Sequence, residues 1–106
     1  MTVNTCLSFA DGLYPNAVPR EMKSRWLAEL EGRIKVELLR QEPESVRETE
    51  ADGEMTVPFP YDQIYWMYLT ALLACIGGDT ARYETGAALF NTAYRSYAKY
   101  LMRAGR

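Results

Sequence analysis

The chain contains no histidine and only two cysteines, Cys6 and Cys75, among its 106 residues. Histidine is the commonest general base and metal ligand, so Ser–His and Cys–His nucleophile pairs cannot form within one chain. Two cysteines alone do not complete a zinc site. Gly77-Gly78 lacks the spacing and the lysine of a phosphate-binding loop. We therefore expect no enzyme activity, no metal and no cofactor.

The two cysteines and the apolar segments predict a cytoplasmic protein without a membrane partner. Both cysteines fall among apolar residues and no signal peptide precedes them, so we expect two reduced thiols acting as small core side chains. The sequence leaves a Cys6–Cys75 bridge open. The longest apolar segment, Ile64 to Ile76, is shorter than the roughly 20 residues that span a bilayer and is rich in tyrosine.

Charge is unevenly distributed along the chain. The net charge of −2 argues against a dedicated nucleic-acid binder, because neutralising phosphates requires a surplus of lysine and arginine. Residues 41–62 hold 1 basic and 7 acidic side chains, a net −6, whereas residues 79–106 hold 5 basic and 2 acidic, a net +3. A solvated loop and a helix C-terminus favourable to cations explain this pattern. Equally, segregated charges allow copies of one protein to associate head to side.

Apolar spacing predicts an all-α fold, a single domain over residues 1–106 built as a small bundle of about four helices. The expected helices cover residues 2–13, 19–41, 61–77 and 79–104, where apolar side chains recur at intervals of three and four. Thr2 and Asp79 suit helix N-caps, and Gly77-Gly78 suits a sharp stop between the last two helices. The third helix is apolar on nearly all sides, which indicates a central or an interface position.

Residues 43–60 interrupt the helical pattern and predict a mobile acidic loop within the domain. Residues 55–57 have the composition of a short β segment, and a strand requires a partner, which a neighbouring subunit could supply. Along the second helix we expect acid-then-base pairs at Glu31–Lys35 and Glu29–Arg33.

Nine apolar and aromatic residues form the expected core. They are Trp26, Leu30, Ile34, Ile64, Tyr68, Leu72, Phe90, Tyr94 and Leu101.

The remaining aromatic and charged residues predict interaction surfaces. Tyrosine and tryptophan are frequent hot spots in interfaces, and such a small domain has room for only some of its 13 aromatic rings. Packing between two helices explains most of these rings. The candidate interface residues are Trp66, Met67 and Tyr100, the basic residues Arg95, Lys99 and Arg103, and the acidic residues Glu48, Glu50, Asp52 and Glu54.

Two carboxylate pairs keep an enzyme hypothesis open as a minor alternative. Asp52 with Glu54, or Asp62 with Glu84, supplies oxygen ligands of the kind that divalent cations prefer. Most such pairs are ordinary surface charges, so we expect no catalytic role for them.

Four segments resemble a known family. They are Val57-Pro-Phe-Pro-Tyr-Asp-Gln-Ile-Tyr65, Gly78-Asp-Thr-Ala-Arg-Tyr83, Phe90-Asn-Thr-Ala-Tyr94 and Arg25-Trp-Leu-Ala-Glu-Leu-Glu-Gly-Arg-Ile34. This pattern resembles head–tail connector (adaptor) proteins of tailed phages and of prophages in Gram-positive bacteria, and covers most of the chain outside the acidic loop.

The resemblance implies a non-catalytic helical subunit of a homo-oligomeric ring below the portal. The expected partners are other copies of the chain, the portal and tail-side structural proteins, and DNA that passes through the ring without sequence-specific binding. Assembly would occur in the bacterial host cytoplasm and end in the virion. A small helical regulatory or protein–protein interaction module is the alternative, although the chain lacks a basic recognition helix.

Overall fold

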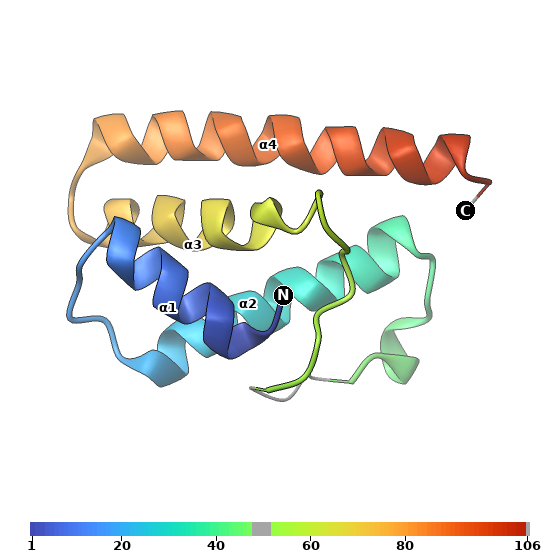
Figure 1. Ribbon diagram of the computed structural model, residues 1–106, viewed down its shortest axis with the longest axis horizontal. Helices are drawn as coiled ribbons and strands as arrows, with labels where there is room; N and C mark the ends of the chain where they lie inside the picture. The colour runs from blue at the N-terminus through green and yellow to red at the C-terminus, as the bar shows by residue number, and fades with distance from the viewer. Residues whose placement is uncertain (48–51, 106) are drawn as a thin grey trace.

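A computed structural model describes residues 1–47 and 52–105 as a bundle of α-helices (Figure 1). Its four α-helices are α1 (Val3–Leu13), α2 (Arg20–Arg33), α3 (Gln63–Ile76) and α4 (Thr80–Arg103). A π-helix, η1 (Ile34–Leu38), continues α2, and a short 3₁₀ helix, η2 (Pro43–Ser45), follows. The described residues contain no strand, which confirms the predicted all-α class.

Local chemistry sets the helix ends as the sequence predicts. The Thr2 side chain accepts a hydrogen bond from the Thr5 amide at 3.0 Å, and Asp79 accepts one from the Arg82 amide at 3.1 Å. These bonds satisfy backbone donors that the first helical turn leaves unpaired. Between α3 and α4, Gly78 has a φ of +76°, a left-handed conformation that glycine adopts without steric cost.

Helix α3 lies at the centre of the bundle, where it contacts α1, α2 and α4. It forms an antiparallel hairpin with α4, the longest helix, which runs along one side of the molecule (Figure 1). The two helices are close at Gly86, where an added Cβ would lie only 3.1 Å from the Ala71 Cβ. The sequence analysis assigned no role to this glycine.

The core agrees only partly with the nine expected residues. Leu30, Ile34, Ile64, Phe90 and Leu101 are buried, while Trp26, Tyr68, Leu72 and Tyr94 are only partly covered. Other fully enclosed side chains come from α1, from α2 and from the hairpin. They include Leu7, Leu27, Tyr65, Leu69 and Tyr97.

The second helix ends earlier than expected, since the apolar spacing predicts a helix over residues 19–41 and regular α-helix ends at Arg33. Regular α-helix stops at Arg33, and the π-helical turn that follows closes with a 3.1 Å hydrogen bond from the Leu39 amide to the Ile34 carbonyl. Arg40 then adopts a positive φ of 59°, which breaks the helix. The helix is therefore terminated before Pro43, the residue that marks its end in the sequence.

The β segment expected at residues 55–57 is reduced to one isolated bridge in the segment that leads into α3. A single antiparallel bridge joins Thr2 to Glu54, and the Met55 amide donates to the Met1 carbonyl at 3.0 Å. The pairing partner is the start of the same chain. Met55 and Val57 are buried in the core, so this part of the predicted loop is packed onto the bundle.

Candidate functional site

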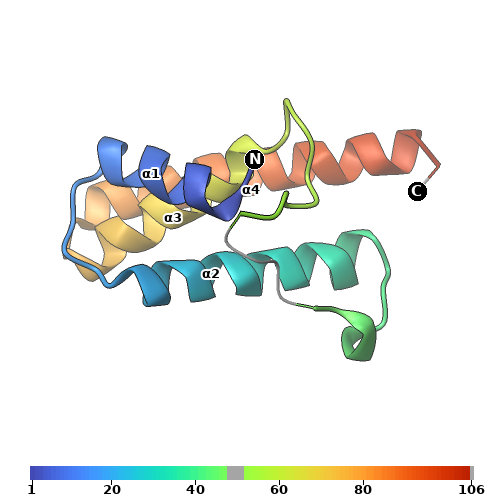
Figure 2. The same ribbon diagram turned by 60° about the horizontal axis from the view of Figure 1, so that its bottom comes forward.

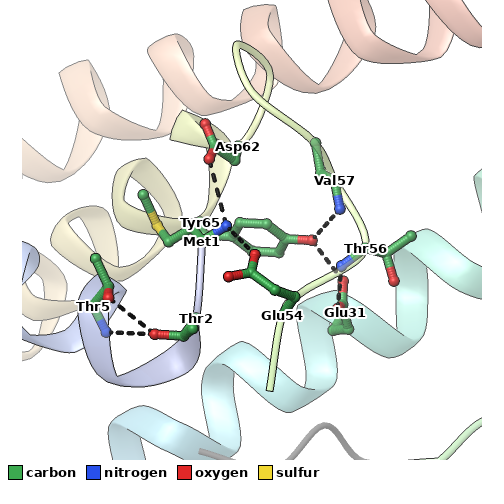
Figure 3. Close-up of polar contacts among 9 residues, drawn as sticks. All are labelled: Met1, Thr2, Thr5, Glu31, Glu54, Thr56, Val57, Asp62 and Tyr65. Carbon is green, nitrogen blue, oxygen red and sulfur yellow. Dashed lines mark hydrogen bonds and ion pairs between the residues drawn. The ribbon is translucent and has the colours of Figure 1, made fainter. Parts of the chain in front are cut away.

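A buried carboxylate on α2 holds the segment leading into α3 (Figure 3). Glu31 is 2% exposed and accepts hydrogen bonds from the Tyr65 hydroxyl at 2.6 Å and from the Thr56 amide at 2.7 Å. The Tyr65 oxygen in turn accepts from the Val57 amide at 2.9 Å. This chain of bonds joins α2, α3 and residues 56–57.

The sequence analysis paired Glu31 with Lys35, four positions along the same helix. That expectation is wrong, because the Lys35 ammonium donates to the Arg47 carbonyl at 3.4 Å instead. Glu31 forms no ion pair with a described residue, so hydrogen bonds alone satisfy this buried carboxylate. Helical spacing gave no signal for it, since its partners come from residues 25 and 34 positions away.

The hydrogen bonds of Glu31 to Tyr65 and Thr56 hold three segments of the chain together, and this set of bonds is the Glu31 tie. Burial raises the pKa of the Tyr65 hydroxyl above its ordinary value, and the adjacent Glu31 carboxylate raises it further. Tyr65 therefore keeps its proton and remains a donor across the physiological range. No buried side-chain polar atom among the described residues lacks a hydrogen-bond partner, so the buried polar groups of this contact are satisfied within the chain.

The start of the chain adds a second tie to the same segment. The Met1 amine lies 2.8 Å from a Glu54 carboxylate oxygen and 3.7 Å from one of Asp62 (Figure 3). The hydrogen bond to Glu54 raises the pKa of this amine above its ordinary value. Glu54, one of the predicted acidic interface residues, thus has a partner within its own chain, although its side chain is still 74% exposed.

A buried lysine fixes the connection between α1 and α2. Lys23 is 5% exposed, and its ammonium lies 2.8 and 2.9 Å from the two Asp11 carboxylate oxygens. Asn16 also donates to Asp11 at 2.9 Å. Although partial burial opposes ionisation of Asp11, the hydrogen bonds from Lys23 and Asn16 hold its pKa below the ordinary value.

The outward side of α4 carries the predicted basic residues. Arg95, Lys99 and Arg103 are all exposed, and none of their side chains forms an ion pair or hydrogen bond with another described residue. Their spacing of four residues stacks them along one side of the helix. In contrast, Tyr94 points inward and donates to Glu37 at 3.0 Å. The C-terminal half of α4 therefore has one side attached to the bundle and another that presents cations to solvent.

The predicted aromatic interface residues are half-buried against the core. The Trp66 ring packs on Phe9 with centroids 5.3 Å apart, and Tyr100 stacks on Tyr61 at 5.0 Å. Met67 also packs against the core cluster. The structure thus gives each of these side chains a neighbour inside the chain, and their role in an interface stays a prediction.

The acidic candidates divide into two groups. Glu48 and Glu50 lie outside the described residues. Asp52 is exposed beside Glu54. No group of three or more potential metal ligands occurs in residues 1–47 and 52–105. Asp62 and Glu84 stand near opposite ends of the hairpin, because Tyr61 packs on Tyr97, 13 residues beyond Glu84 on α4, or roughly 20 Å along a helix.

The two cysteines occupy different environments, which corrects one expectation. Cys6 is fully buried, and burial raises its pKa to about 12. Cys75 is exposed, so it is not the core side chain that its apolar neighbours predict. Both are free thiols, and no Cys6–Cys75 bridge forms.

A groove between α1, α3 and α4 was not anticipated from the sequence. Its volume is about 370 Å³, and its lining includes Leu13, Tyr14, Ala71, Arg82, Gly86 and Leu89. Two apolar side chains remain substantially open there, with Leu13 51% and Leu89 53% exposed. On the segment before α3, Phe59 is 86% exposed. Contiguous exposed apolar surface, as at Leu13 and Leu89 in this groove, is typical of protein or ligand interaction sites.

Comparisons with known proteins identify no relative of this chain. No family model matches the chain, and no curated protein or solved structure matches it either. In the part of the chain that the structure describes, no helix combines the length and apolar character needed to cross a membrane.

Proposed function

We propose that this chain is a head–tail connector subunit of a tailed phage or prophage. In this role it is a non-catalytic virion structural protein that joins a homo-oligomeric ring below the portal and contributes to the channel through which DNA leaves the capsid. Its partners are other copies of itself, the portal and tail-side proteins. It assembles in the bacterial host cytoplasm and resides at the head–tail junction.

The observation that carries the proposal is the spaced sequence pattern, which resembles that of such connectors. Residues 25–34 of the pattern coincide with α2 and the start of η1, and residues 57–65 form the tied segment and the beginning of α3. Residues 78–83 and 90–94 form the hairpin turn and the middle of α4. The pattern therefore falls on the elements that define the bundle.

The distribution of charge supports a subunit that contacts others through unlike surfaces. Helix α4 carries 4 basic residues and 1 acidic residue, a net +3. The described residues between 41 and 62 carry 5 acidic residues and 1 basic residue, a net −4. Rings form when one surface of a subunit binds a different surface of the next, and opposite charges on the two surfaces favour that arrangement.

Electron microscopy of particles assembled with this gene deleted tests the proposal. We expect filled or partly emptied heads without attached tails, because the joint between portal and tail is missing. Complementation with the wild-type chain should restore tailed particles. Tails joined to filled heads in the deletion strain would refute the connector role.

A small helical interaction or regulatory module is the second candidate. The apolar groove and the exposed Phe59 suit a binding protein of this kind as well. Gene context distinguishes the two, since neighbouring portal and capsid genes favour the connector. A normal virion from the deletion strain would leave the interaction module as the better assignment.

A further inference from the structure

We propose that the exposed cations of α4 in one copy bind an acidic turn of a second copy. The basic face consists of Arg95, Lys99 and Arg103, and the acidic turn is Asp52-Gly53-Glu54. The inference deepens the proposed function, because it names the two surfaces through which successive subunits meet, and only the closure of a ring rests on the connector role. The contact joins unlike surfaces and is therefore heterologous.

The basic face is a row of cations on the C-terminal half of α4. Its three side chains are exposed, and none forms an ion pair with another described residue. Successive members are four residues apart, or about 6 Å along the helix. The sequence holds no acidic residue between Glu84 and residue 106, so this half of α4 carries no carboxylate that would neutralise them. Such a row is suited to carboxylates on another surface.

The acidic turn presents carboxylates on an anchored segment. Asp52 is exposed, and the Glu54 side chain is 74% exposed although one of its oxygens lies 2.8 Å from the Met1 amine. Asp62 lies 3.7 Å from the same amine, so three carboxylates and one ammonium leave this surface a net −2. The residue that follows the turn, Met55, is buried in the core, which attaches the turn to the bundle.

The two surfaces lie on opposite sides of one molecule. Helix α3 is the main neighbour of α4, and Figure 1 shows α4 along one edge of the bundle and the start of the segment that leads into α3 at the opposite edge. The contact of Glu54 with the Met1 amine and the hydrogen bond from the Thr56 amide to Glu31 hold this segment in place. A copy therefore does not bring its acidic turn to its own basic face, whereas a second copy can.

Charge complementarity identifies a second copy as the occupant of the basic face. Three arginines outside this face have carboxylate partners within the chain, in the pairs Arg25–Glu29, Arg33–Glu37 and Arg82–Asp79. The basic face has no such partner among the described residues, and the acidic turn offers a net −2 to it. Opposite charges on two surfaces steer their encounter and determine which surfaces meet.

The chemistry of the contact predicts weak, salt-sensitive association of the isolated protein. Exposed ion pairs each contribute little, because water screens them and long side chains lose freedom. Met102 is 76% exposed and lies three positions after Lys99, so it adds apolar surface on the same side of α4. Raising the salt concentration from about 0.01 to 1 M shortens the Debye length from about 30 to 3 Å, so association should weaken.

Zero-length crosslinking tests the contact in the wild-type chain. A carbodiimide joins an amine directly to a carboxylate, and Lys99 is the only lysine of α4. Light and isotopically heavy chains are mixed at low salt and at concentrations up to about 1 mM, where contacts of millimolar Kd are populated. We expect amide bonds between Lys99 of one chain and Asp52 or Glu54 of the other. Crosslinks of Lys99 within one chain only, to other carboxylates only, or none at all would overturn the proposal.

Charge reversal tests which two surfaces meet. Variant A carries Arg95→Glu and Lys99→Glu. Variant B carries Asp52→Lys and Glu54→Lys. Each variant alone should associate at least about 10-fold more weakly than wild type in sedimentation equilibrium, because like charges then face each other across the contact. A mixture of equal amounts should regain association, because the reversed face of A meets the reversed turn of B and the unaltered turn of A meets the unaltered face of B.

A variant with Arg25→Glu and Arg82→Glu is the matched control. It changes the net charge as much as variant A does, at two exposed side chains outside the basic face, and it should associate as wild type does. Equal loss of association by this control and variant A would overturn the proposal, as would a mixture of folded A and B that associates no better than either alone. The crosslinking decides the question independently of whether the variants fold, since it uses the wild-type chain.

The outcome is separable from that of the connector role. If the deletion strain lacks tailed particles but Lys99 does not crosslink to the acidic turn of another chain, the connector role stands and this contact fails. If Lys99 crosslinks as expected but the deletion strain assembles normal virions, the contact stands and the connector role fails.

Discussion

The buried charged residues of α2 and the outward-facing charged residues of α4 have opposite roles. On α2, Lys23 is 5% exposed and Glu31 is 2% exposed, and both are hydrogen-bonded within the chain. On α4, Arg95 and Lys99 are exposed without a described partner. The difference shows that a charge on an amphipathic helix stabilises the fold on one side of this molecule and remains available to other molecules on the other.

The contrast between these charged residues depends on which segments of the chain pack against each helix. The Thr56 amide donates to Glu31, and so does the Tyr65 hydroxyl of α3, which in turn accepts from the Val57 amide. No described segment covers the outward side of Arg95, Lys99 and Arg103. Substitutions of the buried residues Lys23 and Glu31 should therefore change stability, and substitutions on the outward side of α4 should change association.

The largest expected effect on stability comes from a substitution of Leu30, a core residue of α2. Leu30 has no exposed surface, so Leu30→Asp buries an unpaired charge and should cost at least about 5 kcal/mol. A small domain has a total stability of about 5–15 kcal/mol. We expect loss of the cooperative thermal transition in circular dichroism. Leu89→Asp, at a half-exposed position, is the control, and an unchanged melting temperature for Leu30→Asp would contradict the core assignment.

The buried carboxylate should have the next largest effect. Glu31→Ala leaves the Thr56 amide and the Tyr65 hydroxyl without their acceptor, at an expected cost of about 2–4 kcal/mol in urea unfolding. Hydrogen exchange of the Thr56 amide should become much faster. The matched control is Glu29→Ala, whose side chain is 57% exposed. Equal stabilities for the two variants would show that the tie does not hold residues 54–57.

The close contact of α3 and α4 should be sensitive to added volume. Gly86→Leu places side-chain atoms against Ala71, where even a Cβ would be at 3.1 Å, and should destabilise the protein by about 1–3 kcal/mol. Gly12→Ala is the control, because no atom lies within 4 Å of its added Cβ. Thermal unfolding measures both. Greater stability of the Gly86→Leu variant would contradict the observed helix approach.

Acid should weaken the ion pair between α1 and α2. Since Asp11 has a folded-state pKa below its ordinary value of 3.8, its contribution is present above pH 3.8 and is lost as pH falls through the folded value. The Asp11 side chain is 40% exposed, so solvent screening limits the effect to about 1 kcal/mol. Unfolding of wild type and Asp11→Asn should differ at pH 7 and converge in acid. A constant difference between pH 7 and pH 2 would refute this interpretation.

The smallest expected effect on stability is on the outward side of α4. Replacing Arg95, Lys99 and Arg103 by glutamine removes exposed charges without a described partner, so the free energy of unfolding should change by less than about 0.5 kcal/mol. Urea unfolding checks this. A loss of more than about 1 kcal/mol would mean that these cations stabilise the bundle itself.

The sequence predicted the parts of the fold that depend on local chemistry. The Thr2 and Asp79 caps and the Gly78 turn follow from residues within one helical turn of each other. The groove, the Gly86–Ala71 contact and the Glu31 tie were missed, because each joins residues that only the tertiary fold brings together. Helical periodicity cannot distinguish a solvated glutamate from one that a distant loop covers.

The predicted interface residues also divide into those that a local sequence pattern identifies and those whose surroundings depend on the tertiary fold. The exposure of Arg95, Lys99 and Arg103 agrees with their position opposite the apolar seam of α4. Glu54 was expected to face a partner, yet it also binds the Met1 amine, a contact over 53 positions that no local pattern reveals. Phe59 looked like one ring among many, and only its exposure in the folded chain distinguishes it.

The most direct test of the account is the mass of the protein in solution as a function of concentration. Sedimentation equilibrium of wild type and of the Arg95→Gln, Lys99→Gln, Arg103→Gln variant would be compared at low and high salt. The account predicts a wild-type mass that rises with concentration at low salt and a variant that associates more weakly while folding normally. A monomeric wild type at every concentration, or equal association of the two proteins, would contradict it.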